Sequence, residues 1–242
     1  MSVFRFARAK GLCATNPATD AKELITKKRV VTPQPALLEI DALREVLRAA
    51  DVAPISPAVR LASRLCAFSA SRLGPVVAAE WSEFDLDGDT PRWIVPRNKM
   101  KMRHRINDHI VYLGPTIAAE LRAWRERIGG KGYVFPSAIA NGTYPHVTRE
   151  TIEKVYRVTL GLAKRHTLHG WRSAFSTLAK ESKLFPADAV EMALDHVHDS
   201  AVVRAYDRGE RLPDRIALAR WWDAQLNPPQ TGVISIASAR AS

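Results

Sequence analysis

Apolar residues recur every three or four positions along most of this chain, which is the spacing of one face of an α-helix. Between Glu39 and Ala50 the repeating residues are Ile40, Leu43, Val46 and Leu47. Ser56-Pro57 is a typical helix start, with serine at the cap and proline in the first turn, and it predicts a helix through about Ala70. The same pattern predicts further helices over residues 76–81, 115–128, 146–162, 169–182, 186–195, 199–208 and 213–226.

The pattern changes between residues 84 and 113, where short runs typical of strands replace the helical spacing. Residues 84–89 read as a turn between short strands. Residues 92–95 and 106–113 predict two strands of a small antiparallel sheet, joined by the basic segment 97–103. We therefore expect a mainly α fold with a small antiparallel β-sheet inserted early, in the α+β class.

The two ends of the chain differ from its middle. Residues 1–14 carry a short helical pattern, and the basic stretch that follows ends in Val31-Thr32-Pro33-Gln34-Pro35, which is typical of a linker. This composition predicts a domain boundary near residue 35. After Asn227 the chain is rich in Pro, Ser and Ala, which predicts a flexible tail over residues 227–242.

Charge narrows the range of partners. The formal net charge of the 242 residues is +11, which favours a polyanion, nucleic acid first and an acidic membrane surface second. Cys13 and Cys66 are the only cysteines and make neither a disulfide framework nor a metal knuckle. No apolar run approaches the roughly 18 residues of a membrane span, and the N-terminus does not read as a signal peptide. We expect a soluble, cytoplasmic protein that does not act at a membrane.

Candidate chemistry begins at His169-Gly170-Trp171-Arg172. Side chains three residues apart at a helix start project from one face, so His169 and Arg172 lie together. A helix N-terminus favours an anion through its free N–H groups, and a guanidinium with an imidazole strengthens that preference. The pair therefore indicates a phosphate-binding site, although such a pair can also be solvated or act as a cap.

Five separated motifs together resemble the tyrosine recombinase family, specifically the integrases of prophages and genomic islands. Each motif alone is a weak signal, but all five occur in the family's order and at about its spacing. They are Ser71-Arg72-Leu73 with residues 79–87 after it, Asn98–Arg103, His169–Arg172, Leu194-Asp195-His196 and Arg204-Ala205-Tyr206-Asp207-Arg208. The resemblance spans residues 37–226 and implies the catalytic domain of a DNA breaking-rejoining enzyme. Residues 1–25 resemble the last helix of the family's DNA-clamping (core-binding) domain, with residues 26–36 as a basic linker.

The resemblance implies Tyr206 as the nucleophile. Its oxygen attacks the scissile phosphate, forms a 3′-phosphotyrosyl bond and releases a 5′-hydroxyl. His169 handles the tyrosine proton, and Lys101 protonates the leaving 5′-oxygen. A tyrosine hydroxyl has an ordinary pKa near ~10, so at pH 7 it needs a base or a strong positive field in order to attack.

The resemblance also implies how the phosphate is held. Arg72 and Arg172 bind its non-bridging oxygens, and His196 adds a further hydrogen bond. Phosphoryl transfer depends mainly on positioning and charge stabilisation, so two guanidinium groups can take the place of a metal. The resemblance thus implies no metal, cofactor or ATP. The energy of the phosphodiester is kept in the covalent bond.

Several partners follow from the same resemblance. The substrate is double-stranded DNA carrying attachment sites, and the reaction integrates or excises a mobile element. The working assembly is a homotetramer on DNA, while the free protein is expected to be monomeric. Accessory factors that bend DNA or set the direction of recombination are expected as further partners, at the prokaryotic nucleoid.

Other charged and aromatic residues keep two interpretations each. Lys99 and Arg103 compete with Lys101 and are either DNA contacts or solvated hairpin charges. The linker cations Lys27, Lys28 and Arg29 either follow DNA or form a solvated run. Asp195–Asp199 resembles a metal-ligand cluster, but residues two apart on a helix point to different faces and no third ligand set is evident. Trp221-Trp222 is either a platform for stacking bases or, with Trp222 under an amphipathic last helix, part of the core.

Two departures from the family leave alternatives open. Pro75 stands where the family has an acidic residue three positions after its first arginine, so Arg72 is expected to be less well held. The N-terminal part is also short for a full integrase, and fewer phosphate contacts mean weaker binding. A truncated or degenerate integrase acting only as a DNA-binding accessory protein is one alternative. A type IB topoisomerase, which relaxes DNA without site choice, is another.

Overall fold

The computed structural model describes residues 3–17, 34–100, 107–138, 143–196 and 211–228. The chain divides into two units, Met1–Pro33 and Gln34–Ser242. The first unit contains one described helix, α1 (Val3–Ala9), none of whose residues is buried. The assignment of this unit to the end of a DNA-clamping domain stays a prediction.

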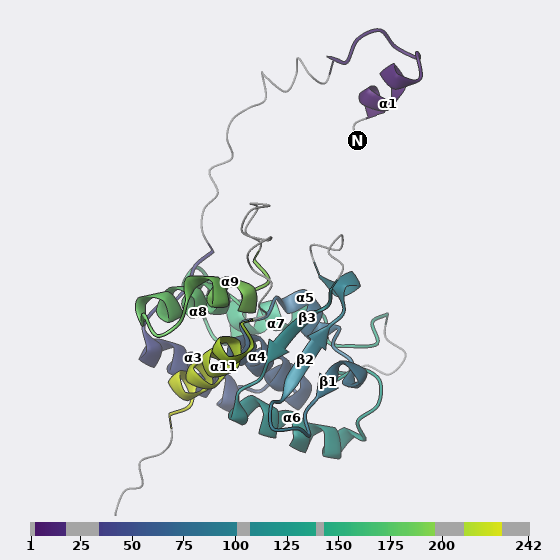
Figure 1. Ribbon diagram of the computed structural model, residues 1–242. Helices are drawn as coiled ribbons and strands as arrows, with labels where there is room; N and C mark the ends of the chain where they lie inside the picture. Colours follow the sequence, from purple (N-terminus) through teal and green to yellow (C-terminus); the bar gives the residue numbers. More distant parts are fainter. Residues whose placement is uncertain (1–2, 18–33, 101–106, 139–142, 197–210, 229–242) are drawn as a thin grey trace, which may run out of the picture. The chain divides into compact units, whose positions relative to one another are not determined.

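Helices make up most of the second unit, with one small sheet among them (Figure 1). In chain order its labelled elements are α3 (Ile40–Val52), α4 (Pro57–Ser69), α5 (Leu73–Val77), β1 (Phe84–Asp85), β2 (Arg92–Val95), β3 (His109–Tyr112), α6 (Pro115–Ile128), α7 (Arg149–Lys154), α8 (Gly170–Glu181), α9 (Ala187–Ala193) and α11 (Leu212–Leu226). The predicted α+β class is confirmed by this arrangement and by the structural relatives reported below.

Helix α4 is the centre of the second unit. It begins as predicted, because Ser56 Oγ accepts a hydrogen bond from the backbone N of Val59 at 3.4 Å and Pro57 occupies the first turn. Most of its residues are buried, and it packs against α3, α5, α6, α7, α8 and α11. A helix that is apolar on nearly every side requires such cover. It ends at Ala70, whose φ of 48° lies in the left-handed region.

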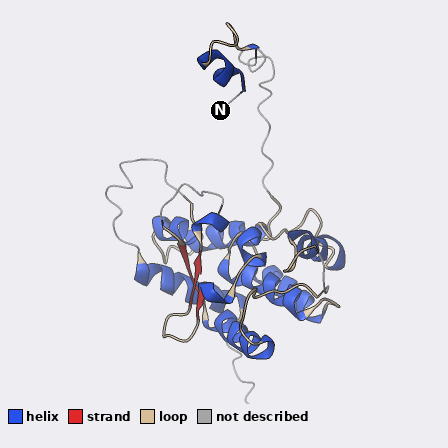
Figure 2. Cartoon of the chain, turned by 90° about the vertical axis from the view of Figure 1, so that its right-hand side faces the viewer, coloured by secondary structure: helices blue, strands red, loops and turns tan. Residues whose placement is uncertain are grey.

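The three strands form an antiparallel sheet in the order β1-β2-β3, seen in red in Figure 2. Trp93 on β2 lies opposite Phe84 on β1 and Val111 on β3. Because side chains alternate along a strand, Trp93 and Val95 point to the same face, and both are buried. One face of the sheet therefore completes the core that α4 begins.

The last described helix, α11, joins parts of the chain that are far apart in sequence. Trp222 is fully buried, and its Nε1 donates to the carbonyl of Ala67 at 2.9 Å. Asp223 accepts from both the backbone N and the hydroxyl of Thr116, at 3.0 and 2.6 Å, and so caps α6. The interpretation of Trp222 as a core residue is confirmed.

The boundaries of two predicted helices are wrong. The helix expected over 76–81 is α5 over Leu73–Val77, because Pro75 fits the first helical turn, where no backbone donor is needed. A 3₁₀ turn, Trp81–Glu83, follows it. The helix expected over 146–162 starts only at Arg149, after a Thr148 cap, and widens into a π-turn over Val155–Thr159.

Two further predictions are shortened, and one cannot be compared. The predicted strand 106–113 is confined to His109–Tyr112. The predicted helix 186–195 ends at Ala193, because Asp195 takes a left-handed φ of 53°. The predicted helix 199–208 lies outside the described residues. Within the described ranges, no helix has the length and apolar character that a bilayer span would need.

Candidate active site

An open cleft of about 1150 Å³ runs along one side of the second unit. Its lining comes from the start of α5, the end of β2, the α7 region and the segment that leads into α8. Four of the predicted site residues line it: Arg72, Lys99, His169 and Arg172. Further cations on its wall are Arg149, Arg157 and Lys164. Such a lining is suited to a polyanion.

Arg172, in the first turn of α8, is the most deeply buried cation of the cleft. Its Nη1 donates to the carbonyl of Ala70 at 2.6 Å, and its Nη2 donates to the carbonyl of Leu194 at 2.7 Å. Burial and the nearby Arg72 lower the pKa of Arg172 to about 10, so the guanidinium stays charged at neutral pH. Its Nε–H is buried and finds no hydrogen-bond partner among the described residues. Arg172 is thus a fixed positive charge held by main-chain acceptors.

Arg72 is the residue just before α5, and it lies against a carboxylate from the other end of the chain. Its Nη1 is 3.4 Å from Asp195 Oδ2. Its side chain remains 25% exposed, whereas that of Asp195 is 2% exposed. One side of the Arg72 guanidinium is therefore held by Asp195, and the remainder can reach the cleft.

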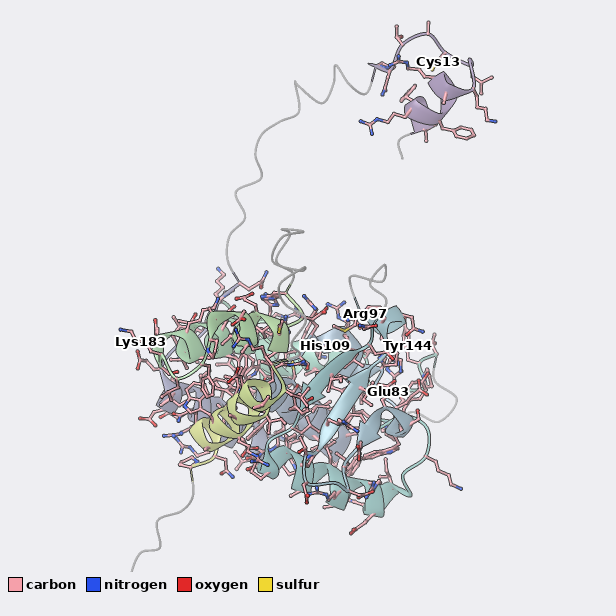
Figure 3. The ribbon with its side chains drawn as sticks, in the orientation of Figure 1. Cys13, Glu83, Arg97, His109, Tyr144 and Lys183 are labelled. Atoms are coloured by element: carbon pink, nitrogen blue, oxygen red, sulfur yellow. The ribbon has the colours of Figure 1, made fainter. Side chains whose placement is uncertain are left out.

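Arg97 holds the same carboxylate from the opposite direction, at the end of β2. Its Nη1 donates to Asp195 Oδ1 at 3.0 Å and Oδ2 at 3.2 Å. Its Nε donates to the carbonyl of Asn107 at 2.6 Å, and its backbone N donates to Asp108 Oδ1 at 2.8 Å. Figure 3 shows Arg97 at the same end of the sheet as His109. These bonds hold Arg97 against Asn107 and Asp108, the residues on either side of the segment from 98 to 106.

The two candidate histidines, His169 and His196, lie in a positive environment. Burial lowers the pKa of His169, and the charges of Arg172 and Arg72 lower it further. Burial also lowers the pKa of His196, the hydrogen bond to Glu191 raises it, and the charges of Arg172 and Arg72 lower it again, so that the net shift is downward. His196 Nε2 is 3.1 Å from Arg172 Nη2, and Nδ1 is 2.7 Å from Glu191 Oε2. Because Arg172 can only donate, His196 accepts at Nε2 and donates from Nδ1 to Glu191.

Lys99 has a different set of partners. Its ammonium donates to the carbonyl of Ala78 at 2.7 Å and to Glu80 at 2.8 Å, and it also contacts Glu83. Burial opposes its charge, but the two carboxylates outweigh burial and raise the pKa of Lys99. Glu83, labelled in Figure 3, in turn accepts from the indole N–H of Trp93 at 2.8 Å. These contacts give Lys99 a role in holding the sheet, and a direct role at DNA stays a prediction.

The structure brings together part of the residue set expected from the sequence. Arg72, His169 and Arg172 line the cleft, and His196 lies next to them against Arg172. Lys99 lines the same cleft. The other predicted residues lie outside the described ranges: Lys27, Lys28, Arg29, Lys101, Arg103 and Tyr206. No group of three or more potential metal ligands occurs among the described residues, and most of the Asp195–Asp199 stretch lies beyond them.

Three residues of this site were not predicted from the sequence as site residues: Arg97, Glu191 and Asp195. Arg97 was visible only as part of a basic segment, and Glu191 only as a polar helix position. Asp195 stood inside a recognised motif, directly before His196. No local signal gave the pairing of Asp195 with Arg97, because 98 positions separate the two residues.

Comparison with known proteins places this geometry in a family. The model of the phage integrase family matches residues 37–211. Among curated proteins, the prophage integrase IntA of Escherichia coli K12 is 28% identical over 235 residues, which are 96% of this chain and 54% of that protein. The chain spans about half the length of the curated relatives it matches.

Solved structures show the same fold. The integrase from mycobacterium phage Brujita aligns over 96% of this chain and 70% of its own, with a TM-score of 0.56 and 16% identity. A lambda integrase tetramer bound to a Holliday junction aligns over 86% of this chain and 56% of its own, with a TM-score of 0.56 and 19% identity. At these identities the likeness concerns the arrangement of helices and sheet.

Proposed function

This chain belongs to the phage integrase family, and from that membership we propose that it is a site-specific DNA recombinase of the tyrosine type. It cleaves and rejoins DNA through a covalent 3′-phosphotyrosyl intermediate, in the integration or excision of a mobile element. One observation carries the proposal: the segment Leu194–His196 holds both Arg72 and Arg172 at one end of the cleft. Two guanidinium groups so placed can neutralise a phosphate in its transition state.

The proposed chemistry assigns each bond to a residue. The oxygen of Tyr206 forms a bond to the scissile phosphorus, the bond to the 5′-oxygen breaks, and the 3′-oxygen stays on the phosphorus. His169 takes the tyrosine proton, which fits a histidine whose lowered pKa keeps it neutral at pH 7. Lys101 gives a proton to the leaving 5′-oxygen. Rejoining is the reverse, with the 5′-hydroxyl as attacking group, so the reaction needs no ATP and no metal.

We propose double-stranded DNA with attachment sites as the substrate and a homotetramer on DNA as the working assembly. The basic cleft supports the first part, and the likeness of fold to a tetrameric lambda integrase on a Holliday junction supports the second. Factors that bend DNA or set direction complete the proposed partners. The protein would then act in the cytoplasm, at the nucleoid.

The first experiment tests the nucleophile and the reaction class together. The protein is incubated with labelled, nicked DNA from the sequences flanking its own gene, and the products are separated on a denaturing gel. We expect a shifted, protease-sensitive band with the wild type and none with Tyr206→Phe. Tyr144→Phe is the matched control, because Tyr144 is 58% exposed and is not among the residues that line the cleft. The control should give the wild-type band.

Other outcomes separate the alternatives. DNA binding in a mobility-shift assay without any adduct would favour a DNA-binding accessory protein. An adduct that forms equally on arbitrary DNA, with relaxation of a supercoiled plasmid, would favour a topoisomerase. An adduct that persists in Tyr206→Phe would show that another residue is the nucleophile.

A further inference from the structure

We propose that Asp195 is the positioning residue that orients Arg72 for the scissile phosphate. The inference rests on the proposed function and adds a residue to its site. Helix α5 itself offers no carboxylate to Arg72, and Pro75 stands three positions after it. The carboxylate that contacts Arg72 comes instead from Asp195, 123 positions later in the chain.

The Asp195 carboxylate is buried between two arginines. The side chain of Asp195 is 2% exposed, and the guanidinium groups of Arg72 and Arg97 lie at 3.4 Å and 3.0 Å from its oxygens. A buried carboxylate is stable only when cations or hydrogen bonds compensate it. His109 does not share in this compensation as a cation, because burial lowers its pKa to about 4 and keeps it neutral. Asp195 therefore interacts as an anion with arginines.

The backbone at Asp195 has an uncommon conformation. Asp195 has a φ of 53°, in the left-handed region that residues other than glycine seldom adopt. Its backbone N donates to the carbonyl of Met192 at 3.1 Å, which ends α9. The left-handed turn places three groups in a row: the Leu194 carbonyl on Arg172, the Asp195 carboxylate on Arg72, and the His196 ring on Arg172. Glycine would adopt this turn without strain but would lose the carboxylate.

Arg97 connects the Asp195 carboxylate to a second part of the proposed site. Arg97 binds both Asp195 and the carbonyl of Asn107. Residues 97 and 107, which flank the segment containing Lys101, are therefore held together. The same carboxylate thus fixes Arg72 directly and the two ends of that segment through Arg97. The Asp195 side chain therefore connects Arg72 with Arg97, and the neighbouring His196 contacts Arg172.

The test is a double-mutant cycle between positions 72 and 195 in the full chain. Single-turnover cleavage is measured for the wild type, Arg72→Ala, Asp195→Asn and the double variant. We expect Arg72→Ala to slow cleavage by about 10²–10³-fold. Asp195→Asn should slow it by roughly 10- to 100-fold, as a misplaced reactive group does. The double variant should be within about threefold of Arg72→Ala, because Asp195 then has no arginine at position 72 to orient.

Two further variants distinguish positioning from a purely structural role. Asp195→Gly removes the carboxylate and relieves the left-handed backbone, so it serves if Asp195→Asn does not fold. Pro75→Glu combined with Asp195→Gly returns a carboxylate near Arg72 and should recover at least about tenfold of the lost rate. Asp223→Asn is the control for loss of a buried carboxylate elsewhere, since Asp223 caps α6 at Thr116. It should lower stability and leave the cycle unchanged.

Multiplied losses in the double variant, or wild-type cleavage in Asp195→Gly, would overturn the proposal. The same cycle is also measured in the dissociation constant of uncleaved duplex. If the wild type does not cleave, the proposed function fails on its own adduct assay, while coupling or additivity in binding still decides the role of Asp195.

Discussion

Two groups of buried charges in this molecule have opposite compositions. The first, called here the arginine cluster, consists of Arg72, Arg97 and Arg172 around the single carboxylate of Asp195. The second, called the Lys99 cluster, consists of one ammonium between the carboxylates of Glu80 and Glu83. Both lie near the cleft, and both use short contacts across the fold. Only the first has more cations than its own anion can balance.

That difference separates a binding site from a structural bond. Buried ions must be paired, so a cluster with surplus cations is stable only where an external anion or water can approach. The arginine cluster has this approach through Arg72, which is partly exposed in the cleft. The Lys99 cluster satisfies its cation internally, with Ala78 as a third acceptor. The sign and size of the local surplus therefore support the proposal that the arginine cluster binds phosphate.

Among the variants that test this difference between the two clusters, Arg172→Ala is expected to have the largest effect. It removes the buried member of the arginine cluster and leaves the carbonyls of Ala70 and Leu194 without their donor. We expect single-turnover cleavage to fall by about 10²–10³-fold, with a loss of stability of about 1–3 kcal/mol from the unpaired carbonyls. Arg172→Lys keeps the charge but not the two-pronged geometry and should stay at least tenfold slow. Wild-type cleavage in Arg172→Lys would show that charge alone suffices.

Lys99→Met is expected to have the second-largest effect. It leaves Glu80 and Glu83 without their cation. We expect a loss of about 2–3 kcal/mol in the free energy of unfolding, because two carboxylates lose their partner. A larger loss is not expected, since Lys99 and Glu80 remain partly exposed to solvent. The measurement is denaturant unfolding, and cleavage per folded molecule should stay within about threefold. Arg125→Met is the matched control: its pair with Asp87 is exposed to solvent, so its loss should leave the free energy of unfolding nearly unchanged. A large loss of cleavage with little loss of stability would assign Lys99 to the site.

The smallest expected effect is a change in the pKa of His169 when the charge of Arg72 is removed. Burial and the charges of Arg172 and Arg72 lower this pKa, so the neutral, proton-accepting form persists below the ordinary histidine range. Cleavage should therefore decline only as pH falls through that lowered pKa. In Arg72→Gln the pKa of His169 should rise, yet remain below its ordinary value because burial persists. Titration of the His169 ring by NMR measures the shift, and an unchanged or lower pKa would contradict the role assigned to Arg72.

Local patterns predicted the parts of this molecule that depend on neighbouring residues. The periodicity of residues 115–128 coincides with α6, and the Ser56-Pro57 signal gives the start of α4. These features follow from capping, proline geometry and one-sided burial, all of which are written within a few positions. The π-turn at Val155–Thr159 was not predicted, because its widening depends on packing rather than on a local signal.

The candidate site was predictable in its motifs and not in its couplings. His169 and Arg172 follow from three-residue spacing, and Arg72 follows from family resemblance. Pro75 led to the expectation of a poorly held Arg72, yet the structure places Asp195 against it from 123 positions away. A carboxylate brought in by tertiary folding has no signature in the sequence around the arginine that it serves.

The position of α11 has a consequence for the order in which the chain can fold during synthesis. Trp222 is packed in the core against Ala67, and the carbonyl of Gln225 accepts a hydrogen bond from Arg44, 181 positions earlier. The first helices of the unit therefore complete their packing only after α11 has been synthesised. Contacts of such long sequence separation slow folding. Until the ribosome has released Leu226, the α4 face that Trp222 covers stays open to chaperones or to other nascent chains. A premature stop codon before α11 would therefore be expected to yield aggregation rather than a shorter recombinase.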